Sequence, residues 1–150
     1  MKSFLFIVAT LFVVSSSFSQ DYTVNHESPT SVVNAIFYAA KTGNYSVLGT
    51  LCDPVGSGDG DVKNLCQLGY GFSEADKQAF KEKGVTEEQF KEEFRKVFGK
   101  GQITGTTRFK SNEFGNYAEI DFYFYPDGTQ KRMETMNLVQ RGNNWYISSF

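Results

Sequence analysis

The sequence predicts an α+β fold in which N-terminal helices pack on a curved antiparallel sheet of about four strands. Three observations lead to this prediction. Apolar residues recur at helical spacing up to about residue 98, and the period then changes to the alternation of strands. Gly-containing steps separate the later segments, as turns do. The helices come first and the strands last, whereas a parallel α/β sheet requires them to alternate.

The first helix is expected to begin at Ser28-Pro29, because serine caps helix N-termini and proline suits the first helical position. Gly43-Asn44 ends this helix and leads into a short second one. The apolar face of the first helix consists of Val32, Val33, Ile36, Phe37 and Ala40.

Residues 73–98 are expected to add an extra charged helical segment of two helices. Thr86 and Gln89 have the spacing of a capping box at the start of the second one. Phe90, Phe94 and Phe98 then form a stripe along one side. Burial against the sheet is the expected reason for such a stripe, and docking of a partner helix is the alternative.

Residues 117–125 alternate strictly between two kinds of side chain, which predicts a half-buried strand. Further strands are expected around residues 103–110, 133–139 and 145–150, with turns at Pro126-Asp127-Gly128 and Gly142-Asn143. The faces that meet the helices then carry no titratable group. The residues predicted to form the core, or the wall of a ligand pocket, are Ile36, Phe37, Ile103, Phe109, Ile120, Phe122, Phe124 and Trp145.

Residues 1–19 have the layout of a cleavable secretory signal. Lys2 precedes the apolar run 4–14, and Ser17 and Ser19 occupy the −3 and −1 places before Gln20. The run is too short to span a bilayer, and no later stretch resembles a membrane span. We therefore expect an exported protein, periplasmic or extracellular, cleaved near Ser19/Gln20 and folding as one domain of residues 20–150. A buried N-terminal strand or a retained anchor is the alternative.

The charge of the exported chain argues against two classes of partner. Without Lys2, 14 basic residues face 17 acidic ones, a net charge of −3. Such a chain has no electrostatic reason to bind nucleic acid or anionic lipid.

Cys52 and Cys66 bracket a glycine-rich stretch that contains Asp53, Asp59 and Asp61. A calcium-loop register that starts at Asp59 fails, and two cysteines with a single histidine do not make a structural zinc site. No metal or cofactor is predicted, and a weak calcium contact by Asp59 and Asp61 is the alternative. Because export favours oxidation, we expect a Cys52–Cys66 disulfide that closes a surface loop of solvated acids. Two buried free thiols are the alternative. The one histidine, His26, is expected to be solvated in a mobile segment.

Two stretches resemble the nuclear-transport-factor-2-like superfamily, the α+β cone domains with a cystatin-like fold. SPTSVVNAIFYAAKTGNYSVLGTLC is similar to their opening helix pair, and METMNLVQRGNNWYISSF is similar to their last hairpin. Within the superfamily, the chain most resembles uncharacterised secreted bacterial domains of the lumazine-binding-like type. The resemblance implies a cone scaffold over residues 28–150, with residues 73–98 as an elaboration, and a dimer formed through the outer face of the sheet.

The superfamily includes isomerases and lyases, so a catalytic acid must be considered. The stretch Asp53-Pro54-Val55-Gly56-Ser57 is similar to the one around the basic aspartate of the isomerases, and Asp53 is the candidate general base. In that family the aspartate lies on a strand well after the second helix. Here it directly follows that helix, which argues against the same role.

The outward face of the sheet is predicted to be an interface, made of Arg108, Glu119, Asp121, Tyr123 and Tyr125. Arg108 and Lys110 are placed to pair with Glu119 and Asp121 across the strands. The acids between the tyrosines would repel phosphate groups, which argues against a surface that stacks nucleic acid bases.

Two functions of different classes follow from these expectations. The first is an exported non-catalytic domain that binds a small apolar ligand or a protein partner, with a homodimer through the outer sheet face as one form. The second is a small isomerase or lyase that uses an acid in the cone pocket. Whether the cone is open or filled by side chains discriminates between them.

Overall fold

The structure is a computed structural model, and it describes residues 22–56 and 58–150. The predicted signal segment and its cleavage point lie outside these residues. The elements run in the order α1 (Pro29–Thr42), 3-10 helix η1 (Tyr45–Thr50), α2 (Gly60–Tyr70), α3 (Glu74–Glu82), α4 (Glu87–Phe98), β1 (Gln102–Asn112), β2 (Gly115–Phe124), β3 (Arg132–Arg141) and β4 (Asn144–Ser149).

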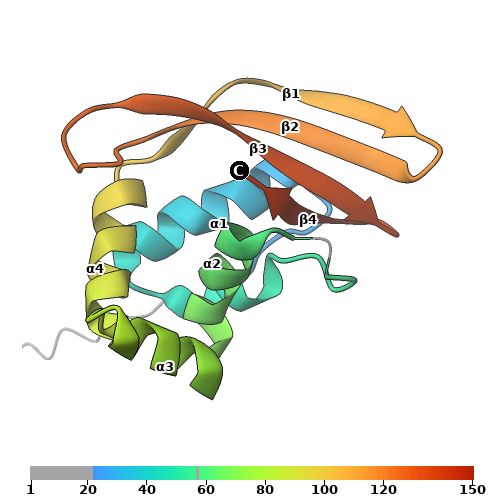
Figure 1. The fold of residues 1–150 in the computed structure, drawn as a ribbon. Helices are drawn as coiled ribbons and strands as arrows, with labels where there is room; N and C mark the ends of the chain where they lie inside the picture. The colour runs from blue at the N-terminus through green and yellow to red at the C-terminus, as the bar shows by residue number, and fades with distance from the viewer. Residues whose placement is uncertain (1–21, 57) are drawn as a thin grey trace, which may run out of the picture.

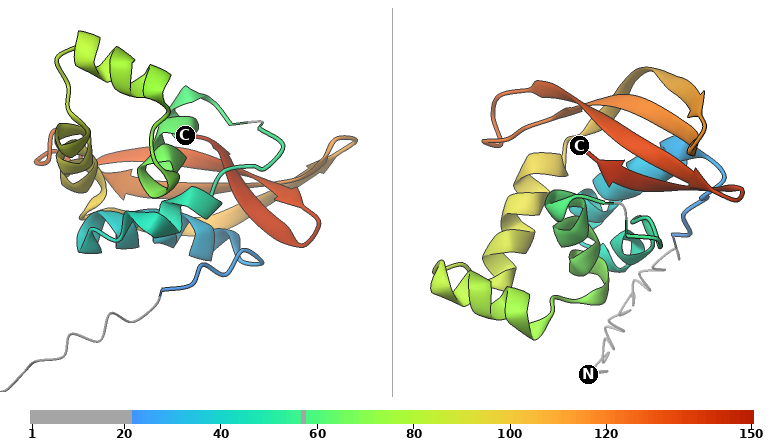
Figure 2. Two further views of the ribbon diagram at one scale, coloured as in Figure 1. Left: turned by 90° about the horizontal axis from the view of Figure 1, so that it is seen from below. Right: turned by 45° about the vertical axis from the view of Figure 1, so that its right-hand side comes forward.

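The four strands form one antiparallel sheet in the order β1-β2-β3-β4. The helices all lie on one side of it, with α1 directly beneath the strands and α3 farthest away (Figure 1). The two further views show the same two-layer arrangement (Figure 2). The α+β class, the antiparallel sheet and the helical segment within residues 73–98 are therefore confirmed. In the described part of the chain, no helix is both long and apolar enough to cross a bilayer.

The first helix begins and ends where the sequence predicts. The Ser28 side chain accepts a hydrogen bond from the Ser31 N–H, and Pro29 is the first helical residue. Gly43 ends α1 at φ 77°, a left-handed conformation that glycine adopts without strain. The predicted face of α1 is buried against the sheet, and Ile36 has no exposed surface.

The stretch between the two cysteines differs from its prediction. We expected one surface loop, but its second half is helix α2, which begins after Asp59. The Asp59 side chain caps this helix by accepting from the Val62 N–H at 3.0 Å. A Cβ atom on Gly69 of α2 would lie 2.1 Å from the Gly49 nitrogen of η1, so only glycine permits this backbone contact.

Cys52 and Cys66 form the predicted disulfide, with their Cα atoms 6.2 Å apart. Cys52 lies two residues after the end of η1, and the bond joins it to Cys66 on the buried face of α2. Cys66 has no exposed surface. The expectation of a disulfide is confirmed, and the alternative of two free thiols is wrong. The disulfide lies at a contact between a chain segment and a helix, rather than closing an isolated loop.

The phenylalanine stripe of α4 packs inside the protein along its whole length. Phe90 contacts Phe72 and Phe80, with ring centroids 5.5 Å away from each. Phe94 meets Tyr45 at 6.0 Å. Phe98 reaches the sheet, where its neighbours are Phe122, Phe124 and Phe150. Burial against the sheet is therefore correct for Phe98, while Phe90 is covered by the two preceding helical segments.

The alternation predicted for β2 is confirmed by burial. Ala118, Ile120 and Phe122 are buried on the side of the helices, and Phe124 is half-buried on the same side. Ile103 pairs with Phe122 and packs against this core, and Trp145 of β4 is also buried.

Phe109 corrects the predicted core. Its register opposite Ala118 gives it the expected face, and its ring lies 5.8 Å from that of Trp145, but 65% of its surface is exposed. The turn end of the β1–β2 hairpin extends beyond the helices (Figure 1), so this part of the sheet lacks the helical cover that buries Phe122. Alternation determines which face a side chain takes, and coverage of that face depends on where the helices end.

The contrast between these two phenylalanines gives a direct test. Phe122→Ala should lower the free energy of unfolding by about 3–5 kcal/mol, because it leaves a cavity in a closed core. Phe109→Ala, on the same sheet face, should cost less than about 1 kcal/mol because the ring is already in water. Chemical denaturation measures both values. Equal losses in the two variants would contradict the assignment.

Candidate functional site

The outer sheet face is the face of the sheet opposite the helices. Three strands contribute to it, through Arg108 of β1, Glu119 and Asp121 of β2, and Thr135 of β3. The Arg108 guanidinium donates two hydrogen bonds to Asp121, at 2.6 and 2.8 Å, and a third to Glu119 at 3.1 Å. The Thr135 hydroxyl donates to Asp121 at 2.6 Å. Lys110 completes the network by pairing with Glu119. The cross-strand pairing predicted from the sequence is therefore present.

The network shifts the ionisation of its members. The Arg108 guanidinium, with help from the Thr135 hydroxyl, holds the pKa of Asp121 well below its usual range. Lys110, and then Arg108, lower the pKa of Glu119. The same contacts raise the pKa of Arg108. Glu119, Asp121 and Arg108 therefore stay charged at neutral pH. The two acids of the network face two bases, so its centre presents little net charge to a partner.

Beyond the network, the same face carries an aromatic and cationic end. The ammonium of Lys131 lies 3.8 Å from the centroid of the Tyr123 ring, and that of Lys100 lies 6.0 Å from the Tyr125 ring. Met133, opposite Tyr123 on the next strand, is exposed. The residues predicted as an interface thus lie on one surface, with the balanced charges at its centre and the tyrosines at one end.

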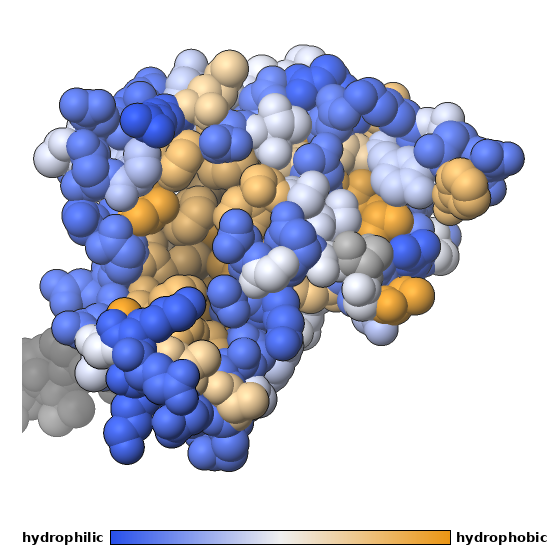
Figure 3. Space-filling model, in the orientation of Figure 1, coloured by the Kyte–Doolittle hydropathy of each residue, from blue (hydrophilic) through white to orange (hydrophobic). Residues whose placement is uncertain are grey.

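On the other side of the sheet, aromatic rings fill the space next to α1 and α4. Phe122 lies between Phe37 and Phe98, with ring centroids 6.0 and 6.4 Å away. Outward from this layer, Figure 3 shows apolar side chains gathered in a hollow between α4 and the sheet. Within the aromatic layer, Phe98 is half-buried and its ring contacts those of Phe124 and Phe150, which are half-buried as well. Apart from Phe109, the predicted pocket residues therefore belong to a packed core or lie against it, and an apolar hollow lies between α4 and the sheet.

Asp53 differs from the sequence expectation in its surroundings. We expected a solvated acid, but its side chain has no exposed surface. The Arg141 guanidinium donates two hydrogen bonds to its carboxylate, at 3.0 and 2.7 Å, and the Val55 N–H donates another at 3.1 Å. The contact raises the pKa of Arg141. A carboxylate with these donors is positioned as a structural anion.

Catalytic candidates are few in the described residues. Asp53 is their only buried acid. A general base needs room for a substrate proton near its oxygen atoms. Both oxygen atoms of Asp53 are occupied by Arg141. Residues 22–56 and 58–150 also contain no group of three or more His, Cys, Asp or Glu side chains placed to hold a metal ion.

Two residues have structural roles that sequence reasoning missed. His26 was expected to be solvated in a mobile segment, but it is half-buried and hydrogen-bonded to β4. Its carbonyl accepts from the Trp145 N–H at 2.7 Å, and its ring lies within 3.2 Å of the Thr50 hydroxyl. Arg141 received no role in the sequence analysis. Its position before a Gly-Asn turn gave no signal, because its partner Asp53 is 88 residues away.

Comparisons of this chain with protein-family models, with curated proteins and with solved structures find no significant match.

The Asp53–Arg141 pair predicts unequal effects of removing either partner. Arg141→Gln leaves a buried carboxylate without the opposite charge, so it should destabilise more than Asp53→Asn, which leaves a half-exposed guanidinium. The double variant should be more stable than Arg141→Gln alone. Denaturation of the three variants measures this coupling, and strict additivity would show that the two side chains do not depend on each other.

Proposed function

We propose that the protein is an exported, non-catalytic domain of the nuclear-transport-factor-2-like type that binds a protein partner through its outer sheet face, with a second copy of the chain as that partner. The observation that carries this proposal is the balanced charge network on a sheet face that the described helices leave uncovered. Charges already paired within one face lose less on leaving water than isolated ones do. The surrounding tyrosines, methionine and arginine are typical of protein interfaces.

A second copy suits this face because both signs of charge are present on it. A twofold interface places the same surface against itself, so an acid of one copy must meet a base of the other. The network at the centre of the outer sheet face contains two bases and two acids, so the centres of two copies can meet without net repulsion. The low net charge of the chain limits repulsion between copies.

Binding of a small apolar ligand is the second candidate. It is favoured by the apolar hollow that Figure 3 shows between α4 and the sheet. The isomerase or lyase alternative receives less support, because the carboxylate proposed for it is held by Arg141.

Export forms part of the proposal, supported by the signal-like layout of residues 1–19 and by a disulfide of the kind that oxidising compartments favour. The intact mass of the exported protein should correspond to a chain that begins at Gln20. Neither cysteine should be alkylated before reduction, and both should be alkylated after it. A retained leader, or two thiols alkylated without reductant, would contradict this part of the proposal.

Self-association is tested by sedimentation over a concentration series. The wild-type chain should shift from monomer to dimer, and Tyr123→Glu should keep it monomeric by placing an unbalanced charge in the interface. Phe109→Glu serves as a matched control, since Phe109 is exposed on the opposite face of the sheet and should leave dimerisation unchanged.

A wild-type chain that stays monomeric at every concentration, or a Tyr123→Glu variant that dimerises like the wild type, would overturn the dimer. Saturable binding of a fluorescent apolar dye, lost in Phe98→Ser but kept in Tyr123→Glu, would then favour the apolar-ligand function.

A further inference from the structure

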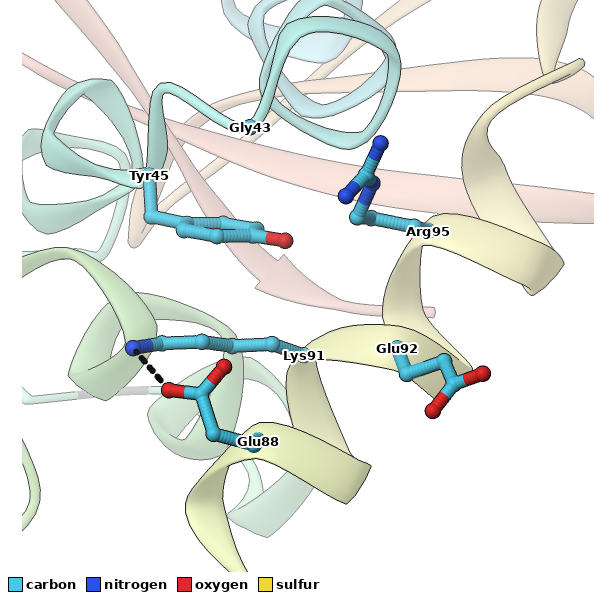
Figure 4. Close-up of a pocket in the computed structure, with 6 residues that line it drawn as sticks. All are labelled: Gly43, Tyr45, Glu88, Lys91, Glu92 and Arg95. Carbon is cyan, nitrogen blue, oxygen red and sulfur yellow. Dashed lines mark hydrogen bonds and ion pairs between the residues drawn. The ribbon is translucent and has the colours of Figure 1, made fainter.

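A polar pocket of about 580 Å³ lies on the helical side of the protein, away from the outer sheet face (Figure 4). One wall comes from the connection between α1 and η1, and the other from α4. The pocket lies within the range of about 300–1000 Å³ found for small-molecule sites. The residues from α4 recur every three or four positions, so they share one face of that helix. The lining residues are Gly43, Tyr45, Glu88, Lys91, Glu92 and Arg95.

Two of these residues give the pocket apolar walls. The Tyr45 ring is half-buried and is held by its edge contact with Phe94. The Lys91 ammonium lies 5.7 Å from the centroid of that ring. Figure 4 shows the Lys91 stem running beside the ring, with the ammonium turned toward Glu88. A ring face and a methylene stem together suit a flat apolar group.

The charges around the pocket are unequally compensated. Glu87 and Glu88 bind the Lys91 ammonium at 3.0 and 3.4 Å, so its charge is balanced within α4. The Glu92 carboxylate points away from Tyr45 (Figure 4). The Arg95 guanidinium forms no ion pair or hydrogen bond with the described residues, and neither does the Tyr45 hydroxyl.

Arg95 is exposed, so water solvates its charge without a carboxylate partner. Gly43 ends α1 and lines the same pocket, so the partly negative C-terminal end of that helix lies nearby. A helix C-terminus stabilises a cation without occupying its hydrogen-bond donors. A guanidinium with unused donors can bind a carboxylate through two parallel hydrogen bonds.

We propose that this pocket binds a small carboxylate that carries a flat apolar group, the chemistry of an aromatic acid. The carboxylate binds the Arg95 guanidinium and the Tyr45 hydroxyl, and the flat group lies along the Tyr45 ring and the Lys91 stem. The site does not depend on the proposed dimer, because its residues come from η1, α4 and the end of α1, while the dimer uses the sheet.

The test is a titration of the exported chain with sodium benzoate, followed in the ¹H–¹⁵N NMR spectrum. Saturable shifts should appear at the amides of Gly43, Tyr45, Lys91 and Arg95. Sodium acetate lacks the ring and benzyl alcohol lacks the charge, so each should bind at least about tenfold more weakly than benzoate. Arg95→Gln should weaken benzoate binding by about tenfold or more, and Arg95→Lys should weaken it less.

Arg132→Gln is the matched control. It removes the same charge at an exposed position of β3 and should leave the benzoate affinity unchanged. A spectrum of each unliganded variant that overlays the wild-type spectrum outside the site establishes that the variant is folded. Absence of saturation, equal affinity for acetate and benzoate, or an unchanged affinity in Arg95→Gln would overturn the proposal. None of these results would affect the dimer, whose residues lie on the sheet.

Discussion

The rest of the structure depends on one constraint: the edge of β4 that faces away from β3 must find hydrogen-bond partners for its backbone. A sheet edge exposes backbone donors and acceptors that must find partners. Three separate segments supply them here. The Trp145 N–H donates to the His26 carbonyl at 2.7 Å, the Ile147 N–H donates to the Leu51 carbonyl at 2.8 Å, and the Asp59 N–H donates to the Ser148 carbonyl at 3.2 Å. One six-residue strand therefore fixes the start of α1, the end of η1 and the start of α2.

Two stronger contacts hold the chain at this edge. Cys52 forms an isolated β-bridge with Ile147 of β4, and its side chain forms the disulfide with Cys66 of α2. The disulfide therefore holds α2 beside the edge of β4. Asp53 then binds Arg141 at the end of β3, which anchors the same segment from the other side. The buried carboxylate is tolerated because a guanidinium and a backbone N–H satisfy it. An acid that could resemble a catalytic base in the sequence thus has a structural role in the fold.

The two faces of the sheet are stabilised by different interactions. The helical face is filled by aromatic rings that exclude water, from Phe37 through Phe122 to Phe98. The outer sheet face instead balances its charges internally, with Arg108 and Asp121 as the central pair. Paired charges keep a face compatible with water and allow it to meet a partner. The polar pocket beside Tyr45 differs from both faces, because its guanidinium has no carboxylate partner among the described residues.

The sequence by itself determined whatever depends on local spacing. Alternation in β2 established which side chains face the helices, Ser28 and Pro29 established where α1 begins, and opposite charges on neighbouring strands predicted the Arg108 network. The tertiary structure alone decided what lies over a side chain once its face is known. Phe109 is exposed because the turn end of the β1–β2 hairpin extends beyond the helices, and Asp53 is buried with Arg141, a partner 88 residues away in the sequence. Spacing along the chain determines the face of a helix or strand on which a side chain lies. Its burial and its partners depend on segments that meet only when the whole chain has folded.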